Sequence, residues 1–362
     1  MGCYIWILNK IKNNHILYMI LILIVFVSLS VLLVFNKTTS TLLKHTLNLS
    51  KGEWIAVTIA NSKNKTDLWL IDTSTQKKQK LLNNKEVVVT GKVNTKGDIL
   101  LYDDAISTNP WDIFRLNIYD KKTHQITNDP LGEVNLHFGD EKGNIIFAKS
   151  GDRNSPMPQI SKINVVKKER KTFNLGSDIG VQDFDVRKNK IIALTFSYKE
   201  YITKRFKEQN SYSKIKYSII EMDTNGGEKK ELAQISAVRL DSISFSKLGN
   251  SIILGGQGAL KNERGFYKLD LNENKISILL TQEELKKTNK IIELSQPYIA
   301  CLSSNEKNIY FAAIPIGTTE TIVMGLTTYP NALYCYNLKE KKLSEVFRIP
   351  GTFIPSISFT YQ

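Results

Sequence analysis

The chain has 362 residues, with 49 lysines and arginines against 35 aspartates and glutamates, which gives a formal net charge of +14. Hydrophobic residues make up 42% and charged residues 23%, the balance of an ordinary folded protein. These values exclude a disordered chain, a collagen-like chain and a polytopic membrane protein. Three cysteines are too few for a disulfide-stapled scaffold, and the length allows one large domain or two smaller ones.

The first fifty residues differ from the rest of the chain. They contain four lysines and no acidic residue, and 16–35 is a run of 20 residues without a charge. A helix of this length spans about 30 Å, the thickness of a bilayer core. The sequence therefore predicts a short cytoplasmic segment at 1–15, a transmembrane helix at 16–35 and a linker at 36–52. A cleaved signal peptide is the alternative, although the run exceeds the usual signal core of about 7–15 residues.

The orientation of this span follows from the flanking charges. Lys10, Lys12 and the amino terminus precede it, whereas Lys37 and Lys44 follow it. The positive-inside rule favours an amino terminus in the cytoplasm. We therefore expect a single-pass protein of the cell membrane, with residues 53–362 outside the cytoplasm. Because part of the charge excess belongs to the anchor, the basic composition does not indicate a nucleic-acid partner.

One hairpin pattern recurs six times along the chain. Each copy has an apolar-alternating strand, a polar turn rich in Asp, Asn and Lys, and a second strand. The copies are 67–82, 112–127, 159–174, 217–232, 265–280 and 332–347. A second hairpin separates successive copies, at 87–103, 134–150, 181–197, 240–256 and 298–314. The repeating unit therefore has four antiparallel strands, and a period of about 45–50 residues is typical of a propeller blade.

Six such units predict an all-β fold, a six-bladed β-propeller over 53–362. The segment 53–60 has the pattern of the second strand of the first blade. Its inner neighbour is either 46–50 or the C-terminal segment 356–362. We favour the C-terminal segment, because a strand from the opposite end of the chain would lock the ring.

Two segments carry a resemblance to a known family. DLWLIDTSTQKK at 67–78 and FSKLGNSIILGG at 245–256 resemble the blade strands of TolB-like six-bladed propellers, although no copy contains the Ser-Pro-Asp-Gly turn of that family. The resemblance covers residues 46–362 and implies a shared propeller architecture.

Three long connections are expected on one face of the propeller. The segment 197–216 has six Lys or Arg and two Glu, with Tyr201, Arg205 and Phe206 near helical spacing. It is either a basic arm for an anionic partner, such as lipid head groups or an envelope polymer, or a solvated helix covering the blade edge. The third connection, 282–296, has a helical pattern.

The second long connection, 314–331, is nearly uncharged and includes Met324 and Tyr329. It is either a hairpin that contacts a partner or a lid over the channel. Trp111, which begins the second outer hairpin, completes the candidate binding residues. Elaboration on one face is how propellers build binding surfaces.

Polar residues on the predicted inner strands are candidates for lining the central channel. They are His137, Asp183, Arg239 and Asp241. No catalytic, phosphate-binding or metal-binding motif occurs in the chain, so we expect no enzyme activity, no metal and no cofactor. Cys301 and Cys335 are expected on strands two apart, which are separated by about 9–10 Å. This distance is too long for a disulfide and predicts two buried free thiols.

These features predict a membrane-anchored, extracytoplasmic propeller that acts as a non-catalytic binding or scaffold module. The expected partner is a protein or an anionic envelope polymer. Two alternatives remain open. One is an enzyme that uses the propeller channel, such as a polysaccharide lyase or hydrolase, and the other is an accessory subunit of a sensory complex.

Overall fold

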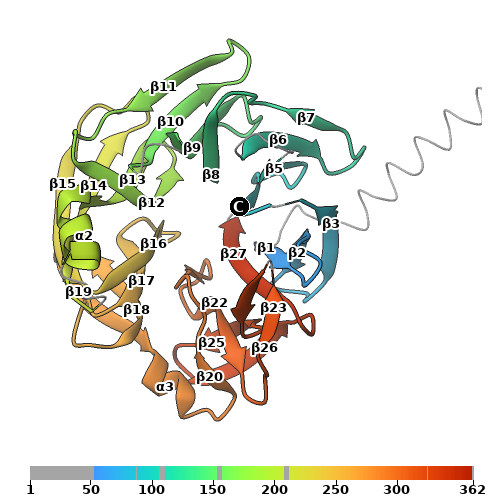
Figure 1. Cartoon of the computed structure of the whole chain (residues 1–362), viewed down its shortest axis with the longest axis vertical. Coiled ribbons are helices and arrows are strands. Elements are labelled where there is room, and N and C mark those ends of the chain that lie inside the picture. The colour runs from blue at the N-terminus through green and yellow to red at the C-terminus, as the bar shows by residue number, and fades with distance from the viewer. Residues whose placement is uncertain are drawn as a thin grey trace, which may run out of the picture. The chain divides into compact units, whose positions relative to one another are not determined.

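The computed structural model describes residues 53–86, 88–105, 111–152, 157–207, 212–323 and 325–360. They form six antiparallel sheets arranged as a ring, with one further two-stranded hairpin (Figure 1). The prediction of a six-bladed β-propeller is confirmed. The predicted transmembrane segment 16–35 lies outside the described residues, and no helix within them is long and apolar enough to cross a membrane.

The first three blades each have four strands, which follow one another from the centre outward. Blade 1 contains β27 (Phe353–Thr360), β1 (Trp54–Ala60), β2 (Thr66–Asp72) and β3 (Lys78–Lys85). Blade 2 contains β4 (Gly91–Val93), β5 (Ile99–Asp104), β6 (Asp112–Asn117) and β7 (Thr123–Gln125). Blade 3 contains β8 (Leu131–Phe138), β9 (Ile145–Asp152), β10 (Gln159–Asn164) and β11 (Glu169–Phe173).

The other three blades carry the longer connections. Blade 4 contains β12 (Ile179–Arg187), β13 (Lys190–Ser197), β14 (Ile215–Asp223) and β15 (Lys230–Ala237). Blade 5 contains β16 (Arg239–Phe245), β17 (Ser251–Gln257), β18 (Arg264–Asp270) and β19 (Lys275–Thr281). In blade 6, β20 (Ile291–Leu294) and β21 (Ala300–Leu302) both pair with β22 (Asn308–Pro315), followed by β25 (Ala332–Asn337) and β26 (Lys342–Phe347).

Blade 1 is assembled from both ends of the ring. The inner strand β27 pairs antiparallel with β1, so that Trp54 lies opposite Thr360 and Val57 lies opposite Ile357. Figure 1 shows β27, in red, beside β1, in blue. The noncovalent pairing of these two strands closes the ring.

The hydrophobic core lies between neighbouring blades. Between blades 6 and 1, for example, Val57 and Phe359 cluster with Tyr310 and Leu333. The second strand of a blade is covered on both sides, and every residue of β1 is buried. This explains why the second strands have continuous apolar runs, whereas the outer strands alternate.

Gly255 and Gly256 lie inside β17, although the run 255–258 has the composition of a loop. A Cβ atom at Gly255 would lie 1.9 Å from the carbonyl oxygen of Tyr298 in the next blade. Glycine is therefore required at this position by a close backbone approach between blades, not by a turn.

Cys301 of β21 and Cys335 of β25 are both paired with Tyr310 of β22, the strand that lies between them. Both are free, as predicted, but only Cys301 is buried, whereas Cys335 is partly exposed. Burial raises the pKa of the Cys301 thiol to about 12. In a Cys3→Ser variant we expect a thiol reagent to leave Cys301 unmodified in the native protein and to titrate two thiols after denaturation. Rapid modification of Cys301 in the native protein would contradict this.

Candidate functional site

The two ends of the propeller differ in their connections. The strands of a blade are antiparallel. The connections from the first strand to the second, and from the third to the fourth, therefore lie at one end of the ring, which we call the turn face. Those from second to third strand, and from one blade to the next, lie at the other end, the loop face. The loop face carries α2 (Tyr198–Ile202) with the π-helical turn η1 (Thr203–Lys207), α3 (Gln282–Lys286), and the hairpin of β23 (Thr321–Val323) and β24 (Leu326–Thr328).

The helix predicted over 282–296 is wrong beyond Lys286. Only α3 is helical, and the residues after it form β20, whose Ile291 lies opposite Pro315 of β22. The reason is tertiary: Ile291 and Leu294 are buried in the core between blades 5 and 6, where a strand extends the sheet.

The basic arm is held against the ring by its own charged residues. Ser197 caps α2 by accepting a hydrogen bond from the Glu200 N–H, 3.1 Å away. The Lys204 ammonium contacts Glu200 at 2.7 Å, and the Arg205 guanidinium donates to the carbonyl oxygen of Val238. Tyr201 packs on Phe196, with 5.4 Å between the ring centroids. Lys204 therefore stabilises the arm internally, and Arg205, which was expected to meet a partner, also anchors the arm over the junction of blades 4 and 5.

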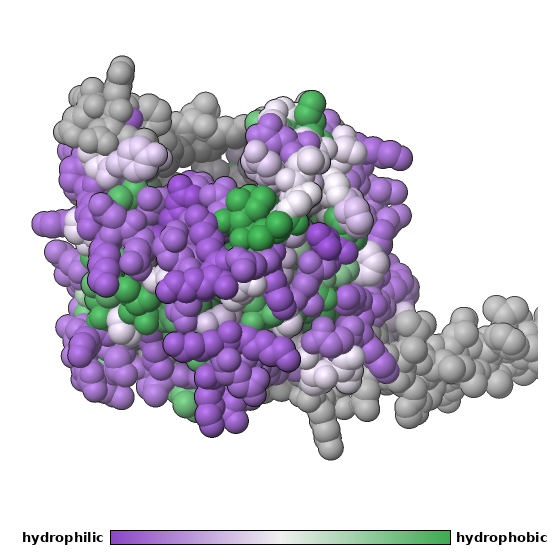
Figure 2. All heavy atoms as spheres, turned by 90° about the horizontal axis from the view of Figure 1, so that it is seen from below, coloured by the Kyte–Doolittle hydropathy of each residue, from purple (hydrophilic) through white to green (hydrophobic). Residues whose placement is uncertain are grey.

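The hairpin β23–β24 forms a sheet of its own and presents apolar side chains to solvent. The exposed fractions are 61% for Ile322, 71% for Leu326 and 37% for Tyr329. Met324 and the side chain of Phe206 lie outside the described residues. The side of the ring seen in Figure 2 is mostly hydrophilic, with hydrophobic residues showing as separate areas.

Trp111 precedes β6, the third strand of blade 2, and is 37% exposed. By topology, Trp111, Tyr201, Arg205 and Tyr329 therefore all lie on the loop face. They belong to connections of blades 2, 4 and 6, so they share a face without forming one cluster.

Carboxylates on the inner strands link blade 4 to blade 5 and blade 5 to blade 6. Asp183 accepts from the Ile243 N–H at 2.8 Å, and Asp185 accepts from the Phe245 N–H at 2.9 Å, both across from β12 to β16. Asp241 of β16 accepts from the Tyr298 N–H at 2.9 Å. Two of the predicted channel residues, Asp183 and Asp241, thus form inter-blade hydrogen bonds.

His137 joins the same network. Its Nδ1 lies 3.2 Å from Asp185, and its Nε2 lies 3.1 Å from the side-chain oxygen of Asn135. The side-chain nitrogen of Asn135 in turn donates a hydrogen bond to Asp183. Burial lowers the pKa of His137, although the hydrogen bond to Asp185 acts to raise it. Burial raises the pKa of Asp183 to about 7. For Asp185 burial also raises the pKa, but the contacts of His137, the charge of Lys92 and the Phe245 N–H together outweigh it and lower the pKa to about 2.

Arg239 stands at the loop-face end of this network. It is the first residue of β16, and its side chain is 45% exposed. Its Nε contacts Asp241, and its Nη1 donates to the Gln296 side-chain oxygen at 2.8 Å. Among the predicted channel residues, Arg239 is thus the one most open to a ligand.

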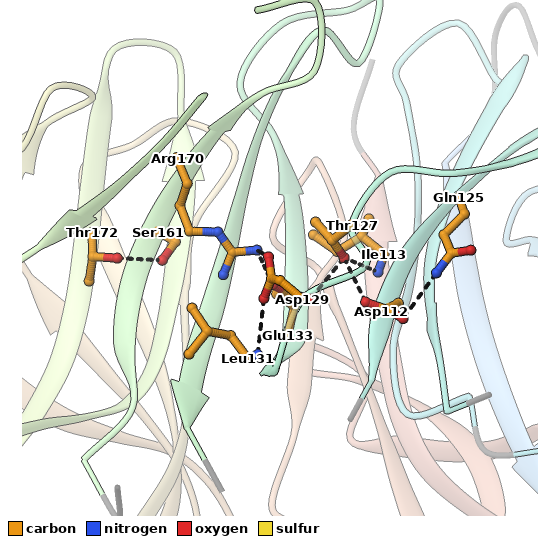
Figure 3. Close-up of polar contacts among 10 residues, drawn as sticks. All are labelled: Asp112, Ile113, Gln125, Thr127, Asp129, Leu131, Glu133, Ser161, Arg170 and Thr172. Atoms are coloured by element: carbon orange, nitrogen blue, oxygen red, sulfur yellow. Dashed lines mark hydrogen bonds and ion pairs between the residues drawn. The ribbon is translucent and has the colours of Figure 1, made fainter. Parts of the chain in front are cut away.

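A buried polar network between blades 2 and 3 was not predicted (Figure 3). Glu133 is fully buried, and its carboxylate contacts Arg170 and the Thr127 hydroxyl, which also contacts Asp112. Arg170 contacts Asp129 as well, at 2.7 Å. The one sequence signal is Glu133 itself, an acidic residue near the start of the inner strand β8.

Within the described ranges of the chain, no three His, Cys, Asp or Glu side chains are grouped so that they could hold a metal ion. No family model matches the sequence, and no curated protein matches it. The fold, by contrast, has clear relatives among solved structures.

TolB from Acinetobacter baumannii has a TM-score of 0.61 at 13% identity, covering 86% of this chain and 67% of that one. A protein designated TolB from Agrobacterium tumefaciens has a TM-score of 0.53 at 8% identity, covering 85% and 99%. A chain of the nidogen/laminin complex has a TM-score of 0.53 at 12% identity, covering 83% and 98%. The chain therefore has the TolB-like fold, a six-bladed β-propeller of four-stranded antiparallel blades.

Proposed function

We propose that the protein is a membrane-anchored, extracytoplasmic propeller that binds a partner protein on its loop face and catalyses no reaction. The observation that carries this proposal is the hairpin β23–β24. It is a separate two-stranded sheet with Ile322 and Leu326 more than half exposed. A lone hairpin is marginally stable in water, so an apolar one gains from a protein surface that covers it.

Two further observations support binding over chemistry. His137 is 6% exposed and, like Asp183 and Asp241, it is engaged in contacts that join inner strands. Among solved structures with this fold, the nidogen/laminin complex contains a propeller in a protein complex.

β1 begins at the turn face, where Trp54 lies opposite Thr360. The chain preceding β1 therefore joins the ring at the end opposite to the hairpin. Membrane fractionation of the full chain, together with protease digestion of intact cells, tests the proposed anchor and side of the membrane.

The binding proposal is tested by photo-crosslinking in membranes. A photo-crosslinking amino acid placed at Leu326 is expected to capture a distinct protein. The same amino acid at Leu248, in the turn between β16 and β17, is the matched control, because Leu248 is 72% exposed but lies on the turn face. Failure of Leu326 to capture a protein, or equal capture at both positions, would overturn the proposal.

A further inference from the structure

A row of polar residues crosses blade 5 at its loop-face end. Arg239 of β16 lies opposite Gln257 of β17, and Gln257 lies opposite Arg264 of β18. Directly opposed residues of antiparallel strands point to the same face of the sheet, and strands two apart are about 10 Å from each other. The three side chains therefore form one row, which faces blade 6.

Both arginines of the row are held in place by blade 6 or by the inner strand. Arg239 contacts Asp241 and Gln296, as described above. Arg264 donates through Nη1 to Glu293 of β20 at 2.8 Å, and the two side chains are 32% and 37% exposed. A guanidinium has five N–H donors in a planar fork, and these contacts occupy only part of each fork. The row thus offers two oriented, partly exposed guanidinium groups.

The surroundings of the row are basic on one side and apolar on the other. Arg205 donates to the carbonyl oxygen of Val238, the residue next to Arg239. On the other side, the charge of Glu293 contributes to raising the pKa of Tyr329, after the larger effects of Glu320 and burial. Glu293, the partner of Arg264, lies opposite Ile314 near the end of β22, and the hairpin β23–β24 follows β22, so it leaves blade 6 at the same end as the row.

We infer that the row Arg239–Gln257–Arg264 binds carboxylates of the partner, and that the bound segment is an acidic stretch of protein with apolar side chains. Arginine pairs with carboxylates bidentately, in a geometry that lysine does not match. The adjacent apolar hairpin favours a protein segment over a polysaccharide, because it offers Ile322 and Leu326 as contacts. The inference rests on the proposed function and specifies its partner.

The test uses the full chain and a fluorescent peptide of alternating Glu and Leu, with binding followed by anisotropy. We expect the protein to bind the peptide with an affinity that falls as salt is added. The affinity should be at least tenfold lower for Arg264→Gln and for Gln257→Glu. Both changes are at partly exposed positions, so they leave folding intact. Arg187→Gln is the matched control and is expected to stay within twofold of the parent, because Arg187, like Arg264, reaches the next blade, but it does so on the turn face, through the Ser246 carbonyl oxygen.

Four results would overturn the inference: no binding, equal binding of the peptide with Gln in place of Glu, equal weakening by Arg187→Gln, or binding of hyaluronate in place of the peptide. The crosslink at Leu326 separates the two proposals. Capture that persists in Arg264→Gln retains the proposed function and rejects the carboxylate site, whereas loss of capture only in Arg264→Gln and Gln257→Glu supports both.

Discussion

Removal of residues 353–362 is expected to abolish cooperative unfolding. The deletion takes away β27, the inner strand of blade 1, with Ile354, Ile357 and Phe359, all at most 5% exposed. Loss of a buried aliphatic or aromatic side chain costs about 2–5 kcal/mol, so three together match the total stability of about 5–15 kcal/mol of an ordinary domain. Far-UV circular dichroism during a thermal melt measures the result.

A point variant keeps this prediction testable if the truncated chain aggregates. Ile357→Asp places a charge among the residues buried between blades 6 and 1. We expect it to lower the melting temperature strongly, whereas Ser358→Ala, which removes one hydrogen bond to the Gly91 carbonyl oxygen, costs only about 1 kcal/mol. An unchanged melt after the truncation would show that β27 does not hold the ring closed.

At pH 8, Arg170→Met is expected to destabilise the protein by about 1–3 kcal/mol, because the buried Glu133 carboxyl loses its cationic partner and must bind a proton. Arg115→Met on β6, where the structure describes no ion pair, is the control and is expected to cost less than about 1 kcal/mol. Urea unfolding gives both values. The double variant Arg170→Met/Glu133→Leu should recover much of the loss, since the buried Glu133 carboxyl is removed together with its partner.

The same network predicts a pH dependence. Burial raises the pKa of Glu133 to about 7, although the positive charge of Arg170 acts to lower it. A folded-state pKa above the unfolded value means that the folded protein binds the proton more tightly. The contribution to stability is therefore fully present below about pH 4.5 and is lost as the pH rises through 7. We expect Glu133→Gln to reduce the difference in unfolding free energy between pH 6 and pH 8 by about 1 kcal/mol, and an unchanged difference would exclude Glu133 as its source.

The strand order of this protein was predictable because short segments of the sequence specify each hairpin. Each hairpin, such as 67–82 or 265–280, has its alternation and its turn within 16 residues, and the repetition of the unit specifies the ring. Contacts between distant residues were not predictable. Arg170 belongs to the charged run 167–171, which has the composition of a solvated turn, yet its guanidinium reaches Glu133 in the inner strand of the blade.

In the candidate site, too, local features were predictable and contacts between distant residues were not. The long connections and their common face followed from the order of the strands, and so did the exposed position of Tyr329. The row of Arg239, Gln257 and Arg264 depends on the register of three strands, which no local pattern specifies. The bonds of Asp183 and Asp241 to the following blade likewise depend on how neighbouring sheets pack.

The register of β27 with β1 also has a use for engineering. Thr360 lies opposite Trp54 in an antiparallel pair, as if the two strands were the arms of a hairpin. A two-residue loop is enough to join such arms. A circular permutant linked there, with new termini in the turn at 224–227 between β14 and β15, would make the inner hairpin of blade 1 continuous. The noncovalent closure of the ring would then move from the inner strands of blade 1 to the outer pair β14–β15 of blade 4, on the turn face and away from the row in blade 5.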